Sequence, residues 1–193
     1  MKRTWLSFGW RQTALLKDPE AFFKNPEKPF DRRRRIHHTE RMKMELCKYD
    51  ALGLAELIRN GEVKAEEVVE NAIENTEKLN PKLNAVIYKA YDQARKQAQA
   101  CDTKKWEEVP PQATFYGVPF LLKDLIAEAK DMPFNEGSRF IEGYISKIDT
   151  ELVKRQKKAG LIILGKTNTP EFGLLPTTEP ESFGPTFNPW HTW

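Results

Sequence analysis

Lys123 is the residue whose surroundings first suggest chemistry. It follows the apolar run Val-Pro-Phe-Leu-Leu in the segment from Gly117 to Asp124. Such a run is typical of a buried strand, and desolvation beside a buried strand lowers the pKa of a lysine toward neutrality. Because a neutral lysine can act as a general base, the segment makes Lys123 a candidate base. The simpler alternative is a surface lysine in a salt bridge at the end of a strand.

A base needs a nucleophile or a metal-bound water to act on, and the familiar patterns for either are missing. The serines are Ser7, Ser138, Ser146 and Ser182. None lies in a G-x-S-x-G nucleophile elbow. The histidines are His37, His38 and His191, and no H-E-x-x-H pair occurs. Two cysteines, at positions 47 and 101, are too few and too far apart for a disulfide framework or a zinc site. We therefore expect no metal and no cofactor.

Residues 160–167 contain a second motif with a chemical meaning. They read Gly-Leu-Ile-Ile-Leu-Gly-Lys-Thr, which fits the phosphate-loop pattern G-x-x-x-x-G-K-[ST] literally. The four middle residues, however, are typical of a buried strand and not of a loop whose N–H groups surround an anion. Thr169-Pro170 follows, and a residue before proline avoids helical backbone angles. Nucleotide binding at 160–167 is therefore the less favoured alternative.

Helical and strand-like segments alternate around these motifs. Helices are predicted over 51–59, 64–79, 88–100 and 150–159, an extended piece over 84–87, and buried strands over 118–122 and 161–164. Asp50 is expected to cap the first helix, Asn80-Pro81 to end the second, and Gly160 to follow the last. This succession of helix, turn and apolar strand indicates an α/β domain.

The charge distribution divides the chain in two. Residues 1–48 carry 13 Lys and Arg against six Asp and Glu, whereas residues 49–193 carry 18 against 22. We predict a basic, poorly structured tail over 1–48 and a folded domain over 49–193. Nucleic-acid binding by the domain is disfavoured by its acidic balance. The arginine run at 32–35 is interpreted as a solvated turn, with a nuclear address or polyanion patch as the alternative.

No apolar run approaches the roughly 18 residues that a membrane span requires. The first 17 residues are basic, but their apolar stretch is too short for the core of a signal peptide. We therefore expect a cytoplasmic protein with no membrane partner.

Taken together, several stretches resemble the amidase signature family. They are Gly117-Val118-Pro119 with Lys123-Asp124, Gly137-Ser138, residues 159–173, Thr178-Glu179-Pro180-Glu181 and residues 183–190. Their order and spacing extend the resemblance over residues 50–193. The block over 159–173 followed by Thr-Glu-Pro-Glu is most similar to the branch that includes 6-aminohexanoate cyclic-dimer hydrolases. The resemblance implies the N-terminal portion of an α/β/α fold, with a mixed central sheet flanked by helices and left incomplete.

The resemblance also implies an activity and a role for Lys123. Members of the family hydrolyse the carbon–nitrogen bond of small amide substrates with a Ser–cis-Ser–Lys triad. By position, Lys123 matches the lysine of that triad. Ser138 matches a family serine outside the triad and is expected to cap a helix or bond to a loop. The residues from Lys166 to Asn168 are expected to organise a loop beside the active site.

The sequence departs from the family after Asn188-Pro189-Trp190. In the family, that segment leads into a Gly-Gly-Ser-Ser-Gly-Gly loop that carries the catalytic serines, and no such loop follows here. Two hypotheses follow beside the nucleotide-binding one. The chain is a truncated N-terminal fragment, inactive alone because triad members act as a unit, or it is half of a split amidase that needs a complementing C-terminal half. Both predict strands with unpaired edges.

Overall fold

The computed structural model describes residues 46–190. Its helices are α2 (Ala51–Arg59), α3 (Ala65–Leu83), α4 (Tyr91–Thr103) and α5 (Glu151–Lys158), and its strands are β1 (Val86–Lys89), β2 (Pro119–Lys123) and β3 (Ile162–Thr167). Short 3₁₀ helices occupy Trp106–Glu108, Arg139–Ile141 and Glu171–Gly173. The prediction of a poorly structured tail falls almost entirely outside the described residues. None of the helices in the described range is long and apolar enough to cross a membrane.

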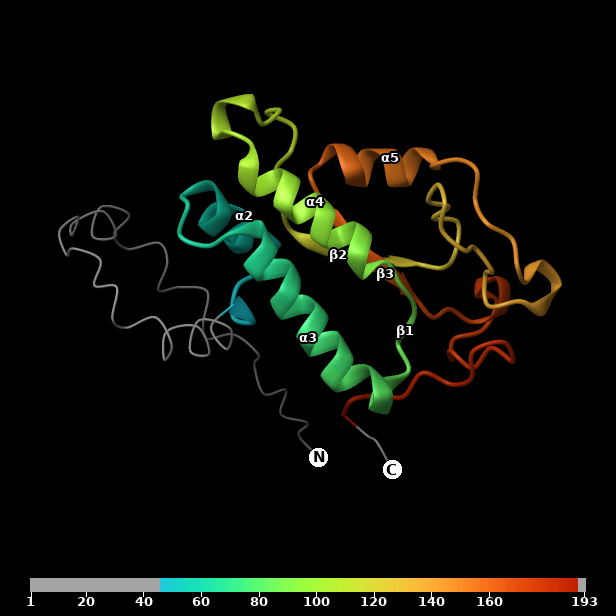
Figure 1. The fold of residues 1–193 in the computed structure, drawn as a ribbon. Coiled ribbons are helices and arrows are strands. Elements are labelled where there is room, and N and C mark those ends of the chain that lie inside the picture. Colours follow the sequence, from blue (N-terminus) through green and yellow to red (C-terminus); the bar gives the residue numbers. More distant parts are fainter. Residues whose placement is uncertain (1–45, 191–193) are drawn as a thin grey trace, which may run out of the picture. The chain divides into compact units, whose positions relative to one another are not determined.

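The three strands form one mixed sheet in the order β1-β3-β2 (Figure 1). The central strand β3 runs antiparallel to β1 and parallel to β2. Within residues 46–190, β1 and β2 each pair on one side only, so both outer edges of this sheet are unpaired. The prediction of an incomplete mixed sheet is confirmed.

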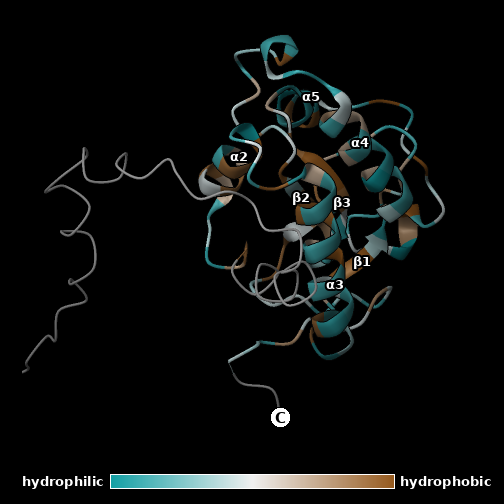
Figure 2. Ribbon diagram, turned by 60° about the vertical axis from the view of Figure 1, so that its left-hand side comes forward, coloured by the Kyte–Doolittle hydropathy of each residue, from teal (hydrophilic) through white to brown (hydrophobic). Residues whose placement is uncertain are grey.

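Helices cover both faces of the sheet. On one face, α3 and α4 pack Val69 and Ala94 against Leu164 of β3. On the other face, Val153 of α5 packs against Leu122 of β2. In Figure 2 the ribbon of β2 and β3 is largely brown, whereas much of α3 and α4 is teal, because these helices turn only a narrow apolar stripe toward the sheet. The three layers confirm the expected α/β/α arrangement.

A bulge in β3 decides which residues face α5. Phe120 of β2 pairs with Ile163, but Leu121 pairs with Gly165, so Leu164 is the extra residue. An extra residue moves everything after it to the opposite face of the sheet. Lys166 therefore lies on the α5 side of the sheet, although simple alternation from Leu164 would place it on the α3 side.

The start of α2 and the end of α5 follow local sequence signals. Asp50 accepts a hydrogen bond from the Gly53 backbone N–H at 2.8 Å and so caps α2, as predicted. Gly160 follows α5 with φ of +91°, an angle that glycine adopts without strain. Its N–H donates to the Lys157 carbonyl at 3.0 Å, and the next N–H donates to the Gln156 carbonyl at 3.3 Å. These two bonds form the Schellman motif expected for a glycine after a helix.

The prediction that α3 ends at Asn80-Pro81 is wrong. The helix continues through Pro81 to Leu83, and Asn84 ends it in a left-handed conformation. The Asn84 backbone N–H donates to the Asn80 carbonyl at 2.7 Å, and the Asn80 side chain accepts hydrogen bonds from two backbone N–H groups beyond the helix. These bonds stabilise the last turn, so the helix extends past a residue that usually ends one.

Gly165 offers a direct test of the sheet register. A Cβ atom at this position would lie 2.0 Å from the Tyr88 carbonyl oxygen of β1. We expect Gly165→Ala to push β1 away from β3 and to lower the free energy of unfolding by about 1–3 kcal/mol. Urea unfolding followed by circular dichroism measures the change. An unchanged unfolding midpoint would contradict the close approach of β1.

Candidate functional site

Lys123 is the last residue of β2 and pairs with Thr167 at the end of β3. Because side chains alternate along a strand, Lys123 points to the α3 side with Leu121, away from Asp124. It is exposed, so residues 46–190 do not themselves desolvate it, and its role as a base stays a prediction. Its ammonium group makes no hydrogen bond or ion pair within that range either, which also removes the surface salt bridge that the sequence left open.

The loops after β2 and β3 lie side by side next to Lys123. The Ile126 backbone N–H donates to the Glu136 carboxylate at 3.1 Å, and the Phe172 N–H donates to the Glu136 carbonyl at 2.8 Å. Ile126 and Phe172 have φ of +57° and +49°, a strained conformation for bulky residues. Ile126 is 70% exposed and Leu174 is 78% exposed. The loops after β2 and β3 thus carry strained backbone at Ile126 and Phe172 and exposed apolar side chains that no other part of residues 46–190 covers. Backbone strain of this kind clusters at functional sites.

Asp124 and Lys166 form a buried ion pair on the opposite face of the sheet. Both side chains are 1% exposed, and the Lys166 Nζ donates to Asp124 Oδ1 at 2.9 Å. The other carboxylate oxygen accepts from the Asn135 backbone N–H at 3.1 Å. The Lys166 Nζ also lies 4.7 Å from the centre of the Phe134 ring. Burial raises the pKa of Asp124, while the Lys166 ammonium and nearby backbone N–H groups oppose that rise.

The sequence did not indicate this pair. Lys166 was expected to organise a loop beside the active site, but its side chain is enclosed between β2 and the segment that carries Phe134. The available signal was a lysine at the end of an apolar strand together with an aspartate at the end of another. Two such strands running parallel bring their carboxyl ends together.

The geometry of a phosphate loop is absent from residues 160–167. Ile162–Thr167 form the central strand, and Lys166 is bonded to Asp124 instead of facing an anion site. The next helical element is the 3₁₀ helix Glu171–Gly173, which does not follow Thr167 directly. The structure therefore contradicts the nucleotide-binding alternative.

Ser138 has the structural role that was predicted for it. Its Oγ accepts from the Phe140 backbone N–H at 3.2 Å and caps the 3₁₀ helix Arg139–Ile141. The same hydroxyl donates to the Glu171 carboxylate at 2.6 Å. Ser138 thus connects two loops and is not placed beside Lys123 by any contact in residues 46–190.

Asn168 joins the end of β3 to the segment that follows it. Its amide nitrogen donates to the Gly184 carbonyl and to the Thr186 hydroxyl, both at 3.0 Å. The Thr186 hydroxyl in turn donates to the Asn84 carbonyl at 2.7 Å. These bonds hold residues 178–190 against the end of α3, and Trp190, the last described residue, is 93% exposed. Residues 183–190 are the segment that resembles the approach to the serine loop of the family. Asn168, directly after β3, therefore holds this segment in place.

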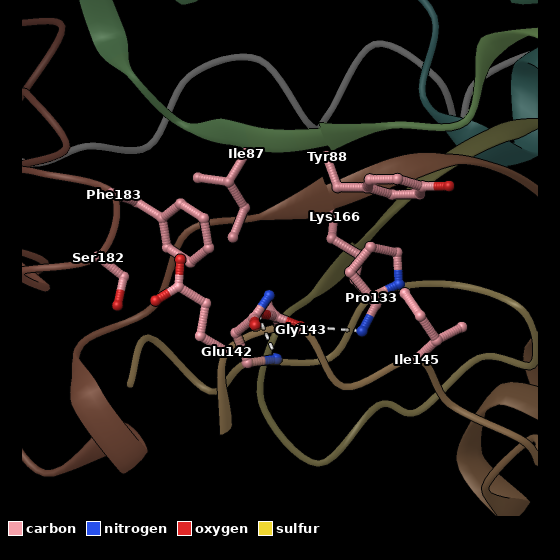
Figure 3. A pocket seen from close by; sticks show the side chains of 11 residues that line it. Ile87, Tyr88, Pro133, Glu142, Gly143, Ile145, Lys166, Ser182 and Phe183 are labelled. Atoms are coloured by element: carbon pink, nitrogen blue, oxygen red, sulfur yellow. Dashed lines mark hydrogen bonds and ion pairs between the residues drawn. The ribbon is translucent and has the colours of Figure 1, made fainter. Parts of the chain in front are cut away.

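A pocket of about 360 Å³ opens on the face of the sheet that carries the buried ion pair (Figure 3). Asp124 and Lys166 line it, and Lys123 does not. Its apolar walls are Ile87, Pro133, Ile145 and Phe183. In the described part of the chain, no group of three or more His, Cys, Asp or Glu side chains is placed to hold a metal ion.

The fold defines the chain as an α/β domain, and an exposed lysine, Lys123, stands at the carboxyl end of one of its strands. The family model described as Amidase matches residues 67–192. This match covers more than half of the chain, and the chain therefore belongs to the amidase family.

Two relatives illustrate the branch within the family. The 6-aminohexanoate-cyclic-dimer hydrolase of Paenarthrobacter ureafaciens is 39% identical over 144 residues, which cover 74% of this chain and 27% of that protein. The 6-aminohexanoate-cyclic-dimer hydrolase of Pseudomonas sp. (strain NK87) is 38% identical over 144 residues, which again cover 74% of this chain and 27% of that protein. The similarity predicted to 6-aminohexanoate cyclic-dimer hydrolases is confirmed.

A solved structure agrees with these relatives. The structure of a 6-aminohexanoate cyclic dimer hydrolase superposes with a TM-score of 0.66 at 37% identity, covering 75% of this chain and 28% of that one. This chain thus spans little more than a quarter of the length of these two relatives and of this solved structure.

Proposed function

We propose that this chain is the lysine-bearing part of an amidase and that Lys123 is the base of a Ser–cis-Ser–Lys triad. The reaction is hydrolysis of the carbon–nitrogen bond of a small amide. Lys123 accepts the proton of the nucleophilic serine through the cis-serine as the serine oxygen attacks the amide carbonyl. The carbon–nitrogen bond breaks while that proton passes to the leaving amine, and water then hydrolyses the acyl-enzyme to the acid and the free serine.

The observation that carries this proposal is the position of Lys123. It ends β2 inside the matched range of the family and stands exposed beside an apolar surface that nothing in residues 46–190 covers. An exposed, unpaired ammonium at the edge of such a surface becomes desolvated when another segment covers it, and desolvation favours the neutral form that a base requires. The exposure of Lys123 therefore supports a triad completed by polypeptide outside these residues.

Two sources can supply the serines. Either the serine-bearing sequence is joined to this chain in a longer polypeptide, or a second chain supplies it as the complementing half of a split enzyme. In both cases the described residues alone carry no amide hydrolysis, because a base without its nucleophile retains no triad chemistry. We also infer a cytoplasmic location, since Cys47 and Cys101 are both free thiols in the described residues.

A chimera tests the proposal. Residues of this chain replace the aligned 144-residue segment of the Paenarthrobacter ureafaciens hydrolase, and hydrolysis of the 6-aminohexanoate cyclic dimer is measured. We expect a folded, active chimera and an inactive isolated chain. A chimera with native-like circular dichroism and no hydrolysis of the dimer or of simple amides would contradict the proposal.

The same two parts, expressed as separate chains, distinguish the sources of the serines. Hydrolysis restored on mixing, together with co-elution in size-exclusion chromatography, supports a two-chain enzyme. Hydrolysis only in the fused form supports a single longer polypeptide.

A further inference from the structure

The buried Asp124–Lys166 pair lies directly beside Lys123 along the chain. Asp124 follows Lys123 and Leu122 precedes it. Both of these neighbours are 1% exposed. Because successive side chains of a strand point to opposite faces, burial of residues 122 and 124 on one face places Lys123 on the other. The direction of the Lys123 side chain therefore depends on how firmly Asp124 is held.

Asp124 is held by its backbone and by both oxygens of its carboxylate. Its N–H donates to the Thr167 carbonyl at 3.1 Å, which joins the end of β2 to the end of β3. One carboxylate oxygen accepts from the Lys166 Nζ at 2.9 Å, and the other accepts from the Asn135 N–H at 3.1 Å. Figure 3 shows Lys166 reaching from the sheet toward the loop that carries Pro133. Asp124 thus connects both strands with the segment that follows β2.

That segment continues to the strained loops near Lys123. Glu136 follows Asn135 directly and has φ of +51°. Its carbonyl accepts from the Phe172 N–H at 2.8 Å, and its carboxylate accepts from the Ile126 N–H at 3.1 Å. Through Asn135, the Asp124 carboxylate therefore anchors the residue that joins the loop after β2 to the loop after β3.

An apolar pair could supply whatever stability this ion pair provides. Replacement of a buried ion pair by apolar residues of similar volume often leaves stability unchanged or higher. An aliphatic side chain, however, offers no acceptor for the Asn135 N–H. The bulge at Leu164 interrupts the ladder shortly before Lys166, and a slip of one residue would move Lys123 to the opposite face. The directional bonds of the ion pair are therefore suited to fix the register at this end of β2.

We propose that Asp124 and Lys166 are positioning residues for Lys123. Their ion pair fixes the end of β2 in the register that keeps the Lys123 side chain on the α3 side of the sheet. The pair acts on catalysis only through Lys123, and this part of the inference rests on the proposed function. The structural part, that the pair fixes the end of β2, does not depend on the role of Lys123 and is tested separately.

Hydrogen exchange followed by ¹H–¹⁵N NMR tests the structural part on the full chain. The variant is Asp124→Leu/Lys166→Met, which removes both charges together. We expect exchange at the N–H groups of residue 124, Asn135 and Ile126 to become at least about tenfold faster, because the end of β2 and the loop after it open locally.

The other end of the same two strands is the internal control. The Ile162 N–H donates to the Val118 carbonyl at 2.8 Å and should keep its exchange rate. Equal acceleration at Ile162 would indicate a general loss of stability. Unchanged exchange at residue 124 would show that the pair does not fix the strand end. Either result overturns the proposal.

Kinetics of the active chimera tests the catalytic part. Asp124→Leu/Lys166→Met should lower kcat by about 10- to 100-fold with KM nearly unchanged, because a displaced base weakens only the transition state. In a chimera that already carries Lys123→Ala, the same double change should have no further effect, since it acts through Lys123. Ile73→Val is the control, because it shortens a buried side chain in the core beside α3 and should leave kcat unchanged.

Three kinetic outcomes would contradict the catalytic part. An equal further loss in the Lys123→Ala chimera would show that the pair supports the fold and not the base. Full activity of Asp124→Leu/Lys166→Met with Lys123 present would show that apolar packing is sufficient. A chimera that is inactive with the native pair contradicts the proposed function itself, and the exchange rates then still decide whether the pair fixes the end of β2.

Discussion

Lys123→Ala in the active chimera should lower kcat/KM for amide hydrolysis by about 10²- to 10⁴-fold, the range by which a positioned base accelerates a reaction. The residue stands at the end of β2, where its ammonium is exposed and has no partner in residues 46–190. Its removal therefore breaks no contact that the described structure contains, and stability should change little. Steady-state kinetics with the cyclic dimer measures the change in kcat/KM, and thermal unfolding followed by circular dichroism measures the change in stability.

Two further variants separate base chemistry from charge. Lys123→Arg keeps the positive charge, but an arginine does not lose its proton in proteins, so this variant should be as inactive as the alanine variant. Lys147→Ala is the matched control, because Lys147 is also exposed and lies outside the strand. Near-normal activity of Lys123→Arg would show that the site needs a charge and not a base.

Lys166→Met should destabilise the chain by about 3–5 kcal/mol, the usual result of removing one partner from a buried ion pair. Asp124 is 1% exposed and would keep only its backbone hydrogen-bond donors. Urea unfolding of the full chain measures the loss. The double variant Asp124→Leu/Lys166→Met should recover much of the stability, because apolar replacement of a buried pair is often neutral or better.

The effect of Lys166→Met should depend on pH with a definite sign. Burial raises the pKa of Asp124 already in the ion pair, and loss of the ammonium raises it further. A carboxyl group with a raised folded pKa favours the folded state below its unfolded pKa and disfavours it as the pH rises through the folded pKa. The destabilisation should therefore be largest at neutral pH and shrink on acidification. A constant difference between variant and wild type from pH 7 to pH 4 would contradict this account.

Local sequence signals were sufficient for most of the elements. Asp50 and Gly160 act through bonds within a few residues of their own helix ends, so their roles could be predicted from the sequence. The apolar runs of β2 and β3 identified buried strands for the same reason, because their burial follows from composition. The prediction failed at Asn80-Pro81, where bonds from residues beyond the helix outweigh the local cost of proline.

The sequence by itself determined the family, because motif order and spacing belong to the linear chain. Only the tertiary structure decided what surrounds Lys123 and Lys166. The bulge at Leu164 moves Lys166 to the α5 face, where it meets Asp124, and strand alternation leaves Lys123 exposed on the other face. Such pairings depend on register between strands about 40 residues apart, and no local pattern of residues encodes that register.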